Sequence, residues 1–445
     1  MRRVPGIRIQ VAPLIVSPKL SRSRISRRGL ARALLPSVVP ELPIRSRIFA
    51  PEGCLSQVAG AVTGSFVSTN ILILIKAHSG NCSFRVILEV TYKKRRDQVR
   101  YYTKKHTHYC GIDLHARTMY LCILDQDGKV LLHKNFPSNA TAFLDAVEPY
   151  MDGLVVCVEC TFTWYWLADL CYEMDIPFVL GHALYMRAIH GGKVKNDRVD
   201  AMKIAMLLRG SLIPYAYVYP GNMRPTRDLL RRRGHLVQLR SEMLTHISNT
   251  NSQYCLDKLP GDIRRKSNRI DIAQHFEEPM VRASIEANLC VIETFEKQIQ
   301  LMELTVLRQA KKDNPYNLTL LQSVPGIGKI LSLTLLYEIH DIARFPSAKK
   351  FASYARLVKG QDSSAGKLKG TKGGKMGNVH LKWALSEAVV CMLGHSEMAK
   401  KYIARKQKRY GKGKAMSVMA HKIGRTLFYM LKRKEPFDQN KFFAS

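Results

Sequence analysis

The spacing of hydrophobic and polar residues indicates an α/β region after residue 100. From Tyr109 to Phe136 apolar residues alternate or run continuously, which predicts three strands with a turn at 125–128. Helical patterns and short apolar runs then follow one another over 140–150, 153–160, 164–174, 176–181 and 198–209. Strands that alternate with helices are typical of an α/β domain.

Strand patterns disappear between about 225 and 315, where two long helices are predicted with a break near "KLPGDI". Apolar residues recur every seven positions in both helices: Leu229, Leu236 and Met243 in the first, and Ile285, Ile292, Ile299 and Val306 in the second. Such a repeat fits an intramolecular helical hairpin and a dimerising coiled coil equally well.

The last part of the chain predicts a small, mainly helical domain. Helical stretches begin with "SVPGIGKILSLTLLYEI" and continue with "FPSAKKFASYARLV". A basic, Gly-rich segment at 359–378 is predicted as a long loop, and apolar helices cover 380–432.

The first hundred residues show only weak periodicity and no methionine between Met1 and Met119. We interpret 1–98 as a non-native or disordered leader, with the native protein starting near Val99. The uncharged stretch at 53–75 is too rich in Gly, Ser, Thr and Asn to predict a membrane span.

Composition narrows the class of partner. The 445 residues include 70 Lys and Arg against 35 Asp and Glu, a formal charge of +35 that is spread along the chain. This excess favours a polyanion, with nucleic acid first, over a small neutral ligand, although basicity for solubility alone would look similar. Ten cysteines at irregular spacings indicate reduced thiols and a cytoplasmic protein.

Four acids stand out against this basic background. Asp113 and Glu159 end two predicted buried strands, and Asp197 and Asp200 in "KNDRVDA" share one face of a helical turn. Singly, each could serve in an ion pair or a cap. Together they suggest metal binding, because buried carboxylates need a cation, and oxygen ligands favour Mg²⁺ or Mn²⁺. Two such ions suit cleavage of a phosphodiester.

Several motifs carry a family resemblance. "GIDLH", "VECT" and "KNDRVDA", followed by "SVPGIGKILSLTLLYEI" and "SSAGK…KMGNVHLKWAL", resemble the DEDD transposases of bacterial insertion sequences, which include the Piv-type invertases. The resemblance covers about 101–437. It implies an RNase H-like (RuvC-like) catalytic domain, a helical coiled-coil spacer and a small C-terminal transposase domain. We therefore expect α/β plus α architecture, with boundaries at 99–220, 221–315, 316–437 and a tail at 438–445.

The resemblance also implies roles for individual residues. Asp113, Glu159, Asp197 and Asp200 would bind two metal ions, and a serine of the C-terminal domain would form a covalent link to DNA. Ser364 fits that position best, although Ala365 interrupts the commoner Ser-Gly pattern and leaves Ser363 as a weaker candidate.

Further residues are predicted to contact nucleic acid. "VPGIGK" resembles a helix-hairpin-helix turn, whose glycines let backbone N–H groups approach a phosphate, and the lysines of the following loop suit backbone contact. The predicted set is Gly326, Gly328, Lys329, Lys367, Lys369, Lys372, Lys375 and Asn378.

The implied function is DNA transposition or recombination through a phosphoserine intermediate. The resemblance further implies a guide, the bridge RNA, and dimers that assemble into tetramers on bacterial nucleoid DNA. Two other functions remain open: a metal-dependent junction nuclease that uses water, and a decayed protein that only binds nucleic acid.

Overall fold

The structure is a computed structural model that describes residues 70–77, 84–91, 101–189, 196–364, 367–372 and 376–444. For 70–77, 84–91, 187–189, 361–364, 367–369 and 371–372 it describes the backbone alone. The chain divides into two compact units, Met1–Gln98 and Val99–Ser445. In the first unit, β1 (Asn70–Ala77) pairs antiparallel with β2 (Phe84–Thr91).

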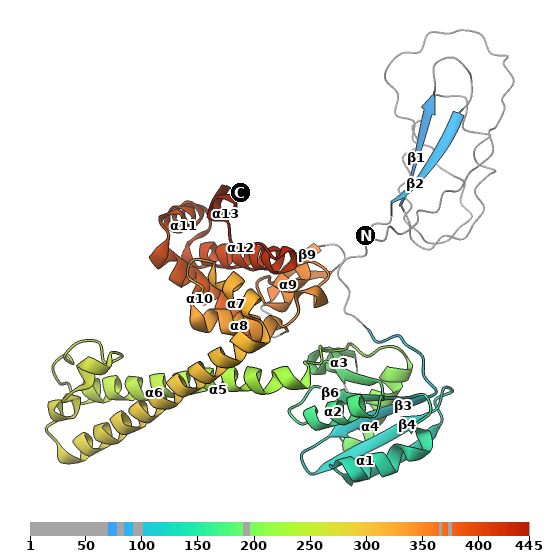
Figure 1. Cartoon of the computed structure of the whole chain (residues 1–445), viewed down its shortest axis with the longest axis horizontal. Coiled ribbons are helices and arrows are strands. Elements are labelled where there is room, and N and C mark those ends of the chain that lie inside the picture. Colours follow the sequence, from blue (N-terminus) through green and yellow to red (C-terminus); the bar gives the residue numbers. More distant parts are fainter. Residues whose placement is uncertain are drawn as a thin grey trace, which may run out of the picture. The chain divides into compact units, whose positions relative to one another are not determined.

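A five-stranded mixed sheet begins the second unit (Figure 1). Its strands, in spatial order, are β5 (Val130–Pro137), β4 (Thr118–Leu124), β3 (His108–Leu114), β6 (Leu154–Glu159) and β7 (Phe178–Gly181). The first three pair antiparallel, whereas β6 runs parallel to both β3 and β7. The α/β prediction for this region is confirmed.

Helices cover both faces of this sheet. They are α1 (Ala140–Val147), followed by the 3₁₀ turn η1 (Glu148–Tyr150), α2 (Tyr165–Glu173), α3 (Ala183–Ile189) and α4 (Asp197–Arg209). Apolar residues of α1 and α2 pack on one face with Ile112 and Val158, and α4 packs on the other with Tyr109 and Cys157. Because strand side chains alternate, each strand contributes to both cores.

Two long helices form an antiparallel hairpin after the sheet. They are α5 (Arg224–Gln253), preceded by η2 (Gly221–Met223), and α6 (Pro279–Asp313), with η3 (Lys266–Arg269) and η4 (Ile272–His275) between them. The heptad residues Ile285, Ile292, Ile299 and Val306 are all buried. Ion pairs from Arg233 to Glu303 and from Arg240 to Glu296 follow an antiparallel register. The intramolecular hairpin is therefore present, and dimerisation through it stays a prediction.

A third region is mainly helical. Its helices are α7 (Pro315–Gln322), α8 (Lys329–Ile339), η5 (Ile342–Arg344), α9 (Ala348–Tyr354), α10 (Val379–His395), α11 (Glu397–Tyr410), α12 (Lys412–Arg433) and α13 (Gln439–Ala444). Its core lies where α8, α10 and α12 meet, with Leu333, Leu385 and Leu427 fully buried. No described helix is long and apolar enough to cross a membrane.

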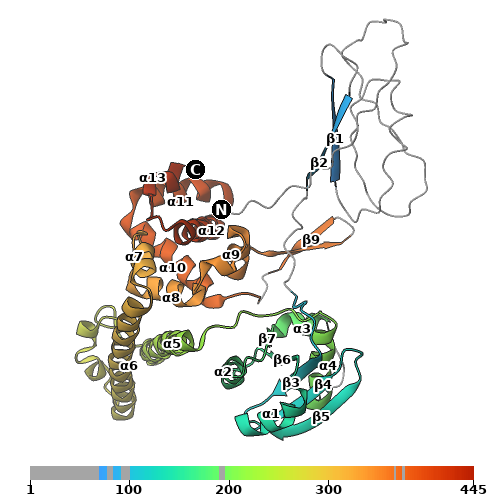
Figure 2. The same ribbon diagram turned by 45° about the vertical axis from the view of Figure 1, so that its right-hand side comes forward.

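The segment predicted as a long loop contains a β-hairpin instead. It leaves the helical region after α9 (Figure 2) and consists of β8 (Gly360–Ser364) and β9 (Lys367–Lys372), paired antiparallel. Its sequence is dominated by Gly, Ser and Lys, so the alternation of apolar residues that signals a strand is missing.

Candidate active site

Two of the predicted acids lie at the same edge of the sheet. Asp113 is the next-to-last residue of β3, Glu159 is the last residue of β6, and the register pairs Ile112 with Val158 in these parallel strands. By alternation both acids face the side of the sheet that α4 covers. The carboxylate of Asp113 is 15% exposed.

The helix α4 brings the other two acids toward this edge. Asp197 and Asp200 lie in its first turn, and the side chain of Asn196 caps the helix by accepting a hydrogen bond from the Arg198 N–H. Close packing depends on Gly111, because a Cβ there would lie 2.2 Å from the backbone N of Ala205. A glycine in the middle of β3 thus lets α4 approach the strand that carries Asp113.

A histidine that the sequence analysis did not select lies between the carboxylates. His115 Nε2 is 3.4 Å from Asp113 Oδ2 and 3.5 Å from Asp197 Oδ1. Asp113, His115 and Asp197 each offer a ligand atom, and these atoms all lie within 4.8 Å of one another. The one sequence feature that could have identified His115 as a site residue is its position two residues after Asp113 in "GIDLH".

The electrostatics favour a cation at this position. Burial raises the pKa of Asp113, and the charges of Asp197 and Asp200 raise it further, while His115 opposes them. Asp200 also pairs with Lys203 at 3.2 Å. The carboxylates repel one another, and carboxylate oxygens with one imidazole nitrogen form a donor set that fits a divalent cation such as Mg²⁺ or Mn²⁺. Glu159 occupies the neighbouring strand end on the same side.

The predicted nucleophile lies on the β-hairpin. Ser364 ends β8 and pairs in register with Lys367, and Ser363 pairs with Leu368 after an irregularity in the ladder. Lys367, Lys369 and Lys372 all belong to β9. Lys375 lies outside the described residues. Roles for these serines and lysines stay predictions.

The glycine turn of "VPGIGK" joins α7 to α8, and its function as a helix-hairpin-helix turn stays a prediction. Gly326 has φ +87°, and a Cβ there would lie 2.4 Å from the backbone N of Met392, so this glycine is required for packing against α10. Gly328 is exposed and directly precedes α8, and Lys329 Nζ lies 3.5 Å from Glu303 Oε2. Nucleic-acid contact by Gly328 and Lys329 stays a prediction.

Asn378 is buried and makes its side-chain hydrogen bonds inside the protein. The residue is 7% exposed, and its Oδ1 caps α10 by accepting hydrogen bonds from the N–H groups of His380 and Leu381. Its Nδ2 donates to Glu338 Oε2 at 2.7 Å. These bonds use both ends of the amide inside the protein and give Asn378 a structural role at the base of the β8–β9 hairpin, while its contact with nucleic acid stays a prediction.

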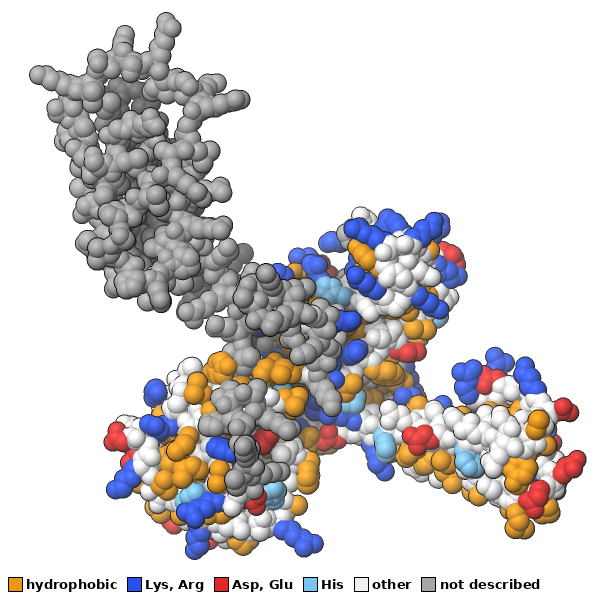
Figure 3. Space-filling view, turned by 180° about the vertical axis from the view of Figure 1, so that it is seen from behind, with side chains coloured by type: hydrophobic (Ala, Val, Ile, Leu, Met, Phe, Trp, Pro, Cys, Tyr) orange, Lys and Arg blue, Asp and Glu red, His pale blue; other side chains and the backbone are white. Residues whose placement is uncertain are grey.

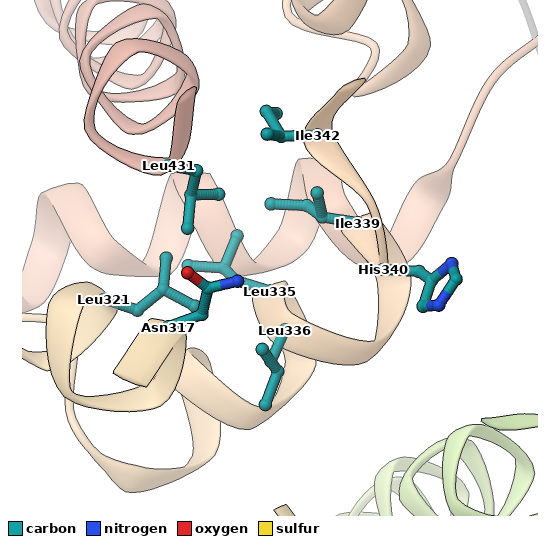
Figure 4. A pocket seen from close by; sticks show the side chains of 8 residues that line it. All are labelled: Asn317, Leu321, Leu335, Leu336, Ile339, His340, Ile342 and Leu431. Carbon is teal, nitrogen blue, oxygen red and sulfur yellow. The ribbon is translucent and has the colours of Figure 1, made fainter. Parts of the chain in front are cut away.

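A pocket in the mainly helical region has a different lining from the acidic edge of the sheet (Figure 4). It is lined by Asn317, Leu321, Leu335, Leu336, Ile339, His340, Ile342 and Leu431. The lining is mainly aliphatic and includes neither a carboxylate nor a Lys or Arg. It therefore lacks the carboxylates that could hold a divalent ion, unlike the acidic edge of the sheet.

Comparison with known protein families identifies two matching regions. Residues 110–256 match a transposase family of the DEDD insertion-sequence type, and residues 318–404 match the transposase IS116/IS110/IS902 family. The first match includes all four acids, and the second includes Ser364 and the glycine turn.

Two relatives extend over most of the chain. The pilin gene-inverting protein of Moraxella bovis is 31% identical over 347 residues, which cover 74% of this chain and 98% of that protein. The transposase for insertion sequence element IS1111A of Coxiella burnetii is 24% identical over 365 residues, which cover 78% of this chain and 94% of that protein.

Proposed function

Since this chain belongs to the DEDD family of insertion-sequence transposases, and is thus a transposase or site-specific recombinase, we propose that it exchanges DNA strands through a covalent phosphoserine intermediate. The observation that carries the proposal is the convergence of Asp113, Asp197 and His115 at the sheet edge, beside Asp200 and the end of β6. The strand order β5-β4-β3-β6-β7, with α4 across one face, supports an RNase H-like catalytic domain.

Asp113, Glu159, Asp197 and Asp200 would hold the divalent ions in this proposal, with Mg²⁺ or Mn²⁺ the ions that suit oxygen donors. When bound, two such ions activate an attacking oxygen and stabilise a leaving oxygen at a phosphodiester. The protein's own contribution is to fix the carboxylates. Gly111 sets the distance between β3 and α4, and Asn196 fixes where α4 begins.

Ser364 supplies the nucleophile in the proposed reaction. Its Oγ loses a proton and bonds to the DNA phosphorus, while the bond from phosphorus to the leaving strand oxygen breaks and that oxygen takes up a proton. A hydroxyl of another DNA end then attacks the phosphoserine and releases Ser364. One phosphodiester bond replaces another, so the exchange needs no ATP.

The partners follow from the same family resemblance. We propose DNA ends and target DNA as substrates on the bacterial nucleoid, a structured bridge RNA that selects them, and dimers that assemble into tetramers. The +35 charge of the chain suits two polyanionic partners.

The proposed function is tested by trapping the covalent intermediate. We expect the full chain, incubated with Mg²⁺, element-end DNA and the flanking transcript, to give a protein–DNA adduct that survives denaturation. Ser364→Ala should abolish the adduct, whereas the matched change Ser363→Ala in the same strand should retain it. Cleavage by Ser364→Ala without any adduct would instead identify a nuclease that uses water, and an adduct lost only in Ser363→Ala would move the nucleophile by one residue.

We also expect His115→Gln to weaken Mn²⁺ binding by about tenfold or more, in the range seen when groups that ligate or orient metal ligands are removed. Electron paramagnetic resonance can count free Mn²⁺ without any DNA present. His108→Gln is the control, because His108 begins β3, at the end of the strand opposite Asp113, and its ring contacts the Asp152 carbonyl and the Tyr150 ring. Equal affinities in the two variants would show that His115 only fills space beside the carboxylates.

A further inference from the structure

The helices α11 and α12 carry a concentration of positive charge that the active site does not use. Between Glu397 and Glu435 the sequence has 13 Lys and Arg and no Asp or Glu. The two border acids pair with Lys400 and Arg433. In Figure 3, blue side chains border the lobe at the upper right, where these helices lie. We call this region the α11–α12 surface.

The fold displays these cations on one side of α11. Lys401, Arg405 and Lys408 are spaced i, i+4 and i+7, and all are exposed. The opposite side of the helix is buried, with Tyr402 and Ile403 each 7% exposed. The three cations therefore form a stripe about 10 Å long, from the helical rise of roughly 1.5 Å per residue.

The cations of the α11–α12 surface also act on one another. Burial lowers the pKa of Lys422 on α12, and the charges of Lys406 and Arg405 on α11 lower it further. Like charges that the fold holds together repel, and a bound polyanion relieves the repulsion. The surface is thus suited to phosphate groups.

The aromatic rings distinguish a duplex from a single strand. Arg405, Lys406 and Lys422 lie 5.7, 5.4 and 4.8 Å from the centroid of the Tyr402 ring. Arg409 and Lys414 lie 5.1 and 4.7 Å from that of Tyr410. Single strands are usually bound by stacking bases on open aromatic rings. Here cationic side chains cover these two rings, so contact with a backbone whose bases are already paired is favoured.

We propose that the α11–α12 surface binds the phosphate backbone of duplex DNA that flanks the reacting strands. Duplex DNA is favoured over duplex RNA because the strands that react in the proposed function are DNA, and the flanking duplex is continuous with them. The inference deepens the proposed function by assigning flanking duplex to a surface, but it depends on neither the metal ions nor Ser364.

The salt dependence of binding tests this assignment. Each phosphate contact to B-DNA contributes about 0.9 to the slope of log K against log salt concentration. We expect the triple variant Lys401→Gln, Arg405→Gln, Lys408→Gln of the full chain to lower that slope by about two to three, measured by fluorescence anisotropy with a 30-base-pair (about three helical turns) DNA duplex in EDTA. EDTA prevents catalysis, so this result is independent of whether the proposed chemistry is correct.

The control variant removes three positive charges from α6 instead of α11. Lys297, Lys311 and Lys312 are exposed on α6, and their triple change to Gln should leave the slope within about one of the unaltered protein. Circular dichroism melting verifies that both triple variants are folded. Equal losses in the two variants, or a loss confined to an RNA duplex of the same length, would overturn the proposal.

Discussion

Asp113→Asn is expected to abolish DNA cleavage while leaving the metal-free protein at least as stable as the unaltered chain. In the folded state burial raises the pKa of Asp113, and Asp197 and Asp200 raise it further. A raised folded pKa means that the folded state binds the proton of Asp113 more tightly than the unfolded state does. Above that pKa the carboxyl group is ionised, and its charge then destabilises the fold. The uncharged amide that replaces the Asp113 carboxylate has the same shape, and it removes both the buried charge and its repulsion by Asp197 and Asp200.

The same substitution removes a metal ligand. We expect a fall in cleavage of at least about a thousandfold, since ions of this kind supply several kcal/mol of transition-state stabilisation. The unaltered protein should also melt at a higher temperature in Mg²⁺ or Mn²⁺ than in EDTA, and Asp113→Asn should lose most of this increase. Calorimetry in both buffers and a cleavage assay measure the two effects.

Asp145→Asn on α1 is the matched control, because Asp145 is exposed and lies on the other side of the sheet from α4. It should leave both cleavage and the response to metal unchanged. If Asp113→Asn instead melted much lower in EDTA and kept its response to Mg²⁺, Asp113 would be a structural residue, and the assignment of the sheet edge as the metal site would fail.

The elements around Asp113 could be predicted because their signal is local. Continuous apolar runs from Tyr109 define buried strands, and acids at their ends are visible in one dimension. Local patterns did not identify His115 as a site residue, because its place in the site depends on its contact with Asp197. Asp197 lies on another element 82 residues later, and tertiary packing alone brings the two together. Spacing within a strand carries no information about which helix will cover it.

Asn378 and Gly326 show a second limit of the sequence. Both stand among glycines and lysines, a composition that indicates an exposed loop, yet one is buried in a hydrogen-bond network and the other packs on α10. The heptad pattern likewise did not predict which helix covers the apolar residues. Ile292 and Ile299 are buried by α5 of the same chain, but the pattern fits burial by a second chain equally well.

The network that surrounds Asn378 centres on a buried carboxylate. Glu338 on α8 is 1% exposed and accepts hydrogen bonds from Arg227 Nε at 3.0 Å and from Arg231 Nε at 2.6 Å, both on α5. Asn378 donates to it from the start of α10. Burial by itself would raise the pKa of Glu338, but the hydrogen bond from Arg231 and the charges of both arginines lower it to about 2.

This network fixes the two ends of the segment that carries Ser364. The backbone N–H of Asn378 donates to the Tyr354 carbonyl at 2.6 Å, and Arg356 Nε donates to the Gly377 carbonyl at 2.9 Å. Tyr354 ends α9 before the hairpin, and Gly377 follows it. Glu338 therefore anchors the base of the β8–β9 hairpin to helix α5. We predict that Glu338 acts as a positioning residue for Ser364.

Glu338→Gln is expected to cost about 3 kcal/mol of unfolding free energy at pH 7, because it leaves buried Arg227 without its countercharge. Since the folded pKa of Glu338 is lowered, its stabilisation is present above the unfolded value of 4.5 and is lost as pH falls toward 2. The gap between Glu338→Gln and the unaltered protein should therefore narrow at pH 3, as urea unfolding at both pH values can measure.

The functional effect separates positioning from folding. At a temperature where Glu338→Gln is fully folded, adduct formation at saturating DNA should fall at least about tenfold, an energetic loss of 1.4 kcal/mol, while the affinity for DNA changes little. Glu296→Gln breaks another Arg–Glu pair of α5, with Arg240, that includes no contact with the base of the β8–β9 hairpin, and it should form the adduct at the normal rate. Normal adduct formation in folded Glu338→Gln would show that the buried network holds α5 to α8 without setting the position of Ser364.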